Sequence, residues 1–129
     1  MKLILDTNAY SNMMRRHENV VRVIGSATQI YLPAPVVGEL FFGFQMGNQS
    51  QQNHQQLQQF LDHPLVEFSA TDELVCNRYA LILSQLKKKG QPIPTNDIWI
   101  AAHALTLGAD LLSSDDHFSC IDGLSWLKP

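Results

Sequence analysis

The chain of 129 residues has the length of one domain built on one hydrophobic core. Hydrophobic residues make up 45% of the chain and charged residues 16%, a composition that excludes wholesale disorder. The formal net charge of -3 excludes a global basic field, so any site that handles phosphate groups must be local.

The apolar segments and the cysteines indicate a soluble cytoplasmic protein with no membrane contact. Two cysteines without C-x-x-C spacing are too few for a disulfide framework and favour a reducing compartment. The first apolar run, Leu3–Leu5, is cut short by Asp6, which fits neither a signal peptide nor an anchor. The longest apolar stretch, residues 98–112, contains His103 and Asp110 and is too short and polar to span a bilayer.

In the first half of the chain, short β-type runs alternate with helical patterns. We expect a buried strand over 3–5, a helix over 11–25, a strand over 30–32 and a helix from Pro35 to Gly47. The glutamine-rich segment 45–59 fits either a flexible tract or a solvated helix, and the helix propensity of glutamine favours the helix.

The second half continues the alternation. We expect a strand over 66–68, a helix from the cap at Ser69–Asp72 to Gly90, a helix from Asn96 or Asp97 to Gly108, and strands over 109–113 and 124–127. No hairpin signal separates these strands. The pattern therefore predicts a single α/β domain, residues 1–129, with helices packed on a mainly parallel central sheet.

Four acidic residues occupy unusual places. Asp6 ends the first strand, Asp115 follows the strand at 111–112, and Asp97 opens a helix. Glu39 lies one turn inside the helix that begins at Pro35, among apolar neighbours. Each position has an ordinary explanation on its own, as a helix cap, a turn residue or an exposed charge. Together they occupy the elements that face one another at the carboxyl ends of parallel strands, where ligands bind.

A cluster of these four carboxylates requires a cation. Two like charges about 4 Å apart repel by about 4 kcal/mol at an effective dielectric near 20. Hard oxygen ligands without histidine or thiolate select Mg²⁺ or Mn²⁺ rather than zinc. Without the four acids, the chain has nine basic and eight acidic residues, so the surplus negative charge is concentrated in them.

Four segments resemble the motifs of the PIN-domain nucleases, and most closely those of the VapC-type toxins of toxin–antitoxin pairs. They are LILDTN at 3–8, PVVGEL at 35–40, NDIWIAA at 96–102 and LSSDDHF at 112–118. The likeness runs from Leu3 to about Leu127. It implies a three-layer α/β/α fold, a Mg²⁺- or Mn²⁺-dependent endoribonuclease, an RNA substrate, a cognate antitoxin and a homodimer.

The resemblance also assigns the candidate site. It places the catalytic and metal-binding carboxylates at Asp6, Glu39, Asp97 and Asp115. Supporting polar positions match Thr7, Asn8, Asn96 and Ser113. Asp116 and His117 follow Asp115 where the family varies; Asp116 is an alternative or additional ligand, and His117 is a less favoured general base.

Several alternatives remain open from the sequence. The main rival is a non-catalytic PIN-fold partner within a DNA-binding repressor complex, although such a protein would be expected to have lost at least one acid. A phosphatase-like hydrolase would require a glycine-rich phosphate loop or an Asp-x-Asp motif, and the sequence has neither. The basic residues of segments 15–22 and 87–89 either contact RNA phosphates or form solvated surface. At least one of Phe41, Phe42 and Phe44 should emerge near Glu39 as an anchor for an antitoxin.

Overall fold

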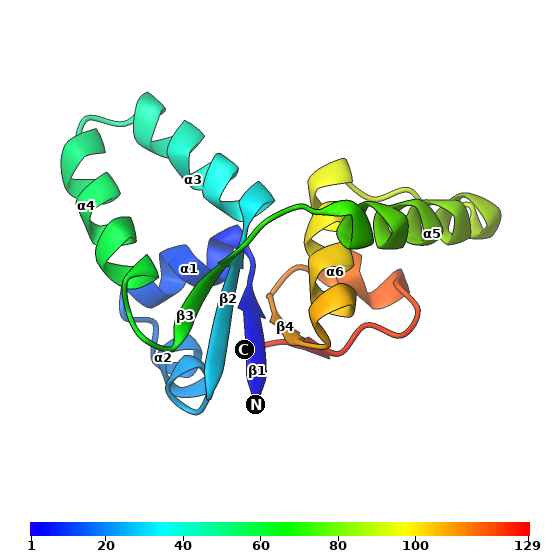
Figure 1. The fold of residues 1–129 in the computed structure, drawn as a ribbon, viewed down its shortest axis with the longest axis horizontal. Coiled ribbons are helices and arrows are strands. Elements are labelled where there is room, and N and C mark those ends of the chain that lie inside the picture. The colour runs from blue at the N-terminus through cyan, green and yellow to red at the C-terminus, as the bar shows by residue number, and fades with distance from the viewer.

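A computed structural model describes the whole chain, residues 1–129, and shows a five-stranded sheet with helices on both sides (Figure 1). The strands are β1 Lys2–Leu5, β2 Gln29–Pro33, β3 Val66–Ser69, β4 Asp110–Leu112 and β5 Trp126–Leu127. Their order in the sheet is β3-β2-β1-β4-β5, and every neighbouring pair is parallel. The first strand is therefore central, with Leu3 paired to Ile30 on one side and to Asp110 on the other.

Six α-helices and one 3-10 helix complete the fold. They are α1 Thr7–Met14, α2 Glu18–Gly25, α3 Ala34–Met46, α4 Ser50–Leu61, α5 Glu73–Lys89, α6 Thr95–Leu107 and η1 Asp116–Cys120. In Figure 1, α1, α2 and α4 lie on one side of the sheet, and α5 and α6 lie on the other. Helix α3 leaves the carboxyl end of β2 and contacts both α1 and α6. No helix combines the length and the apolar character that crossing a bilayer requires.

The core lies between the central strand and the helices that cover it. All three apolar residues of Leu3–Leu5 are fully buried, as expected for a strand covered on both faces. Ala101 and Ala102 of α6 are also fully buried. Because their side chains are small, they allow this helix to lie close to its neighbours, and the first turn of α6 is thereby held at the edge of the sheet.

The prediction of one helix over 11–25 is wrong, because two helices occupy this region. Helix α1 starts earlier, at Thr7, since the Asp6 carboxylate accepts a hydrogen bond from the backbone N–H of Ala9. The helix ends at Met14, and Arg16 takes a positive φ of 60° that redirects the chain into α2. A non-glycine residue in this conformation is uncommon, which is why nothing in the composition of the segment predicted the break.

The other predicted elements are present with small shifts in their bounds. The glutamine-rich segment forms α4, whose Leu57 is buried in the core. Helix α5 begins after Asp72, which caps the N–H of Val75, and ends at Gly90, whose φ of 67° suits glycine. Helix α6 begins at Thr95, slightly before the predicted start, and the last strand is shorter than expected.

Candidate active site

Four acidic residues meet at the carboxyl edge of the sheet, and we call this group the acidic centre. Asp6 follows β1 and Asp115 follows the neighbouring strand β4, while Asp97 lies in the first turn of α6 and Glu39 in α3. The charges of Asp97 and Asp115 act on Asp6, and the charges of Asp115 and Glu39 act on Asp97. The structure therefore brings together all four acids that the sequence singled out.

Asp6 is the most deeply placed of the four, with 6% of its surface exposed. Its Oδ1 accepts the N–H of Ala9 at 2.8 Å, and its Oδ2 accepts the hydroxyl of Ser113. Burial raises the pKa of Asp6, the two hydrogen bonds lower it, and the neighbouring charges of Asp97 and Asp115 raise it again, with a net upward shift. The two hydrogen bonds fix the position of this carboxylate, and burial disfavours its ionised form.

Asp97 connects the members of the acidic centre electrostatically. Its carboxylate is partly buried, and burial is the largest cause of its raised pKa. The negative charges of Asp115 and Glu39 raise the pKa further, whereas a hydrogen bond and the charge of His117 lower it. The fold thus holds Asp97 where a negative charge is disfavoured unless a cation is near.

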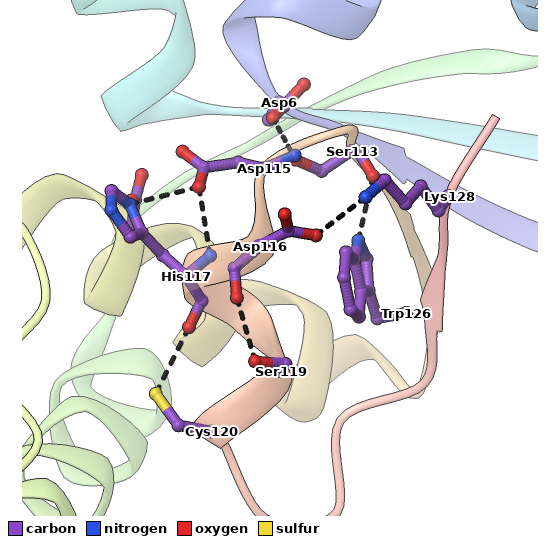
Figure 2. A network of polar contacts seen from close by, with 10 residues as sticks. Asp6, Ser113, Asp115, Asp116, His117, Ser119, Cys120, Trp126 and Lys128 are labelled. Atoms are coloured by element: carbon purple, nitrogen blue, oxygen red, sulfur yellow. Dashed lines mark hydrogen bonds and ion pairs between the residues drawn. The ribbon is translucent and has the colours of Figure 1, made fainter.

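His117 stands between two of the acids. Its Nδ1 lies 3.0 Å from Asp97 Oδ2 and 3.0 Å from Asp115 Oδ1, and Figure 2 shows the imidazole beside Asp115. The hydrogen bond to Asp97 is the main cause of the raised pKa of His117, and the charge of Asp115 adds to it. One ligand atom from each of these three residues fits within 4.8 Å, the spacing of a metal site.

Ser113 connects Asp6 to Asp115. Its hydroxyl donates to Asp6 Oδ2 and accepts the backbone N–H of Asp115 at 3.0 Å, as the upper part of Figure 2 shows. Its backbone N–H bonds to Leu127 in β5, and its carbonyl accepts the indole N–H of Trp126 at 2.8 Å. The last strand therefore braces the loop that positions both carboxylates.

The remaining predicted supporting residues have unequal parts. Thr7 donates a hydrogen bond from Oγ1 to Glu39 Oε1 at 3.0 Å and so ties α1 to α3 across the site. Asn8 and Asn96 are exposed beside Thr7 and Asp97 in the chain. Asp116 turns away from the acidic centre, because its carboxylate pairs with Lys128 Nζ at 2.7 Å (Figure 2).

His117 was expected only as a less favoured general base, and the structure places its imidazole between Asp97 and Asp115; His103, for which the sequence suggested no role, is buried. The signal for His117 was present, since it lies two residues beyond Asp115 and Asp115 caps its backbone N–H at 2.9 Å. His103 is fully buried on α6, and hydroxyls of Ser69 and Thr71 lie within hydrogen-bond distance of its two ring nitrogens. Its partners are more than 30 positions away in the chain, so no local pattern could have identified them.

The donor set of the acidic centre fits a hard divalent cation. Its carboxylate oxygens come from separate elements and carry like charges that raise one another's pKa values, and such a group is best compensated by Mg²⁺ or Mn²⁺. No cysteine lies among the grouped residues, so the ligands do not resemble those of a structural zinc site.

Comparison with known proteins agrees with this architecture. A family model described as PIN domain matches residues 3–124. The chain belongs to the PIN domain family. The solved structure of VapBC-1 from nontypeable Haemophilus influenzae aligns with this PIN domain with a TM-score of 0.88 and 26% identity, covering 99% of this chain and 98% of that one. The predicted three-layer α/β/α fold with a parallel central sheet is therefore confirmed.

Two curated relatives give a sense of the distance within the family. Ribonuclease VapC2 of Rickettsia felis is 28% identical over 120 residues, which cover 89% of this PIN domain and 87% of the relative. Ribonuclease VapC1 of Haemophilus influenzae strain R2866 is 43% identical over 56 residues, but that match spans only 42% of the relative's length. The predicted resemblance to VapC proteins is confirmed.

Proposed function

We propose that this PIN domain is a VapC-type endoribonuclease that hydrolyses RNA phosphodiester bonds with the aid of Mg²⁺ or Mn²⁺. The observation that carries this proposal is the convergence of Asp6, Glu39, Asp97 and Asp115 from four separate elements onto one edge of the sheet. A fold that merely holds a partner gains nothing from concentrating like charges there. The ribonuclease names of the VapC relatives support the same conclusion.

The proposed metal ligands are Asp6, Asp97 and Asp115, with Glu39 at the rim. When bound, the ion would lower the pKa of a water molecule for attack on phosphorus and stabilise the charge on the leaving oxygen. The chain positions the ligands for this role: Ser113 holds Asp6 and Asp115 at a fixed spacing, and Thr7 orients Glu39. This preorganisation removes the need to reorder the carboxylates when substrate and metal arrive.

RNA binding in the cytoplasm would use local positive charge, since the chain as a whole is acidic. Arg15, Arg16 and Arg22 are exposed around the junction of α1 and α2, and we propose that they contact backbone phosphates. At the end of α5, Lys89 is already paired with Asp122 at 2.6 Å, so it is a weaker candidate for this role.

We also propose that the partner is a cognate antitoxin that packs along α3, and that the toxin forms a homodimer. Phe42 is 68% exposed and Met46 is 74% exposed on this helix, on the same element as Glu39. Phe41 and Phe44 instead pack around His54 of α4. An antitoxin segment with an apolar side chain over Phe42 and an Arg or Lys over the acidic centre would satisfy both surfaces.

Cleavage by the purified protein tests the proposal. Total RNA is incubated with wild type, Asp97→Asn and the matched control Asp116→Asn, with Mg²⁺ or Mn²⁺, and the new RNA ends are sequenced. We expect Asp97→Asn to lose about 1,000-fold or more of the cleavage rate, because the amide removes a ligand charge and keeps the volume. Asp116→Asn should cleave at the wild-type rate, since its side chain pairs with Lys128 outside the acidic centre.

Two results would contradict the nuclease. Absence of metal-dependent cleavage by wild type, or equal cleavage by wild type and folded Asp97→Asn, would favour the non-catalytic partner of a repressor complex. For the antitoxin surface, Phe42→Asp should weaken the complex with the neighbouring gene product at least tenfold while cleavage is unchanged. Leu81→Asp, at an exposed leucine on α5, is the matched control and should bind normally.

A further inference from the structure

We infer that His117 is a direct ligand of the proposed metal ion, through Nδ1, beside Asp97 and Asp115. The inference rests on the proposed function and adds a nitrogen donor to a site that the sequence assigns to carboxylates alone. Its basis is the placement of the imidazole between two carboxylates that come from different parts of the fold.

The spacing of the three atoms is that of donors around one ion. In an octahedral site with metal–ligand distances of about 2.1 Å, neighbouring donors are about 3.0 Å apart. Nδ1 lies 3.0 Å from Asp97 Oδ2 and 3.0 Å from Asp115 Oδ1. Small rotations of the side chains are therefore sufficient to admit an ion, with no movement of the backbone.

The backbone around His117 is anchored, whereas its ring is accessible. Phe118 next to it is buried in the core, the His117 N–H bonds to Asp115, and its carbonyl accepts the Sγ–H of Cys120. The side chain of His117 is 50% exposed, so a hydrated ion can reach it from solvent. A fixed backbone and a solvent-accessible imidazole would allow His117 to bind a metal ion that exchanges with solution.

The chemistry of the three atoms also calls for a cation between them. Nδ1 donates its proton to Asp97 in the hydrogen bond described above; once that proton is lost, the lone pair faces two carboxylate oxygens and is repelled unless a positive charge bridges them. A divalent ion supplies that charge to all three atoms at once and relieves the repulsion between Asp97 and Asp115. Because Mg²⁺ prefers an all-oxygen shell whereas imidazole suits transition metals, His117 should shift the preference of the site toward Mn²⁺.

Pulsed electron paramagnetic resonance of bound Mn²⁺ tests the inference directly. Wild type should show nitrogen modulation from a coordinated imidazole, and labelling histidine with ¹⁵N should change that modulation. His117→Ala and His117→Gln should both lose it and bind Mn²⁺ at least tenfold more weakly, with a smaller loss for Mg²⁺ in calorimetry. His63→Ala is the matched control, because His63 is an exposed histidine in the α4–β3 loop.

The outcomes separate this inference from the proposed function. Mn²⁺ binding to wild type without histidine modulation, or modulation that persists in both folded His117 variants, would overturn the His117 ligand and leave the carboxylate site intact. Failure of wild type to bind Mn²⁺ at millimolar concentration would instead overturn the metal-dependent nuclease itself. Asp97→Asn removes a carboxylate ligand, so it should bind Mn²⁺ more weakly than wild type whether or not His117 is a ligand.

Discussion

Helix α6 carries two polar centres of opposite character. In its first turn, Asp97 belongs to the acidic centre, where like charges face one another at the protein surface. Two turns later, His103 is fully buried, with Ser69 Oγ 2.8 Å from Nδ1 and Thr71 Oγ1 2.9 Å from Nε2. The same helix therefore supports one centre in which both ring nitrogens have hydroxyl partners and another in which several carboxylates repel one another beside a single imidazole.

The difference separates polar residues that are paired within the fold from those that we propose bind a cation. Both ring nitrogens of His103 have hydroxyl partners, so the hydrogen-bonding groups of the neutral ring are satisfied within the fold. In the acidic centre, hydrogen bonds from Ser113 and Thr7 orient the carboxylates without removing their repulsion. We propose that an external cation completes that centre, and the predictions below separate the two behaviours.

The largest effect on stability is expected at the buried centre. His103→Ala should lower the free energy of unfolding by about 4 kcal/mol, because it leaves a cavity and a buried Ser69 hydroxyl without its partner. Urea denaturation measures this loss. His17→Ala, at an exposed histidine whose side chain makes no capping bond, should change stability by less than about 0.5 kcal/mol. Equal effects of the two substitutions would contradict the structural role of His103.

Acid should destabilise the protein through His103. Burial lowers the pKa of His103 from 6.5 to about 4, against the opposing charge of Asp72, so the unfolded state binds the proton more readily than the folded state. The contribution is present above pH 6.5 and is lost as the pH falls toward 4, by about 3 kcal/mol in total. Denaturation across this range should show a weaker acid dependence in His103→Gln, and parallel curves would refute the assignment.

Metal binding should stabilise the protein through the acidic centre and independently of the buried His103. At about 100 times the dissociation constant, Mn²⁺ should raise the free energy of unfolding by about 2.7 kcal/mol through mass action on the folded state. Differential scanning calorimetry with Mn²⁺ and with a chelator measures the gain. His103→Gln should retain the gain and Asp97→Asn should lose most of it; retention by both variants would place the ion elsewhere.

The smallest expected effect is a gain in stability when a functional charge is removed. The fold raises the pKa of Asp97, so its ionised form is disfavoured in the folded state relative to the unfolded state. In a chelating buffer at neutral pH, Asp97→Asn should therefore raise the free energy of unfolding while abolishing cleavage. Thermal melts would contradict this expectation if the variant proved less stable than wild type.

The fold was largely predictable because its signals are local. The apolar run Leu3–Leu5, the cap at Asp72 and the glycine at position 90 each specify the conformation of their own segment, and the structure has them as expected. The break between α1 and α2 depends on one residue, Arg16, in a conformation that its side chain does not favour. Only the packing of the whole chain can impose such a conformation.

The site was predictable in part for the same reason. The sequence identified the four acids by their places at the ends of strands and helices, and the structure brings them together. It did not show that Asp116 pairs with Lys128, nor that His117 reaches Asp97 across 20 positions of the chain. Side-chain direction decides both contacts, and a position in a motif does not fix that direction.

The order of the strands makes assembly of the acidic centre depend on the last part of the chain to be translated. Ser113 and Asp6 lie 107 positions apart in the chain, yet they share a hydrogen bond because β4 pairs beside β1 in the finished sheet. At about 5–20 residues per second, translation needs roughly 5–20 s to pass from one to the other. A nascent chain therefore cannot complete the acidic centre until its C-terminal segment emerges and β4 pairs beside β1.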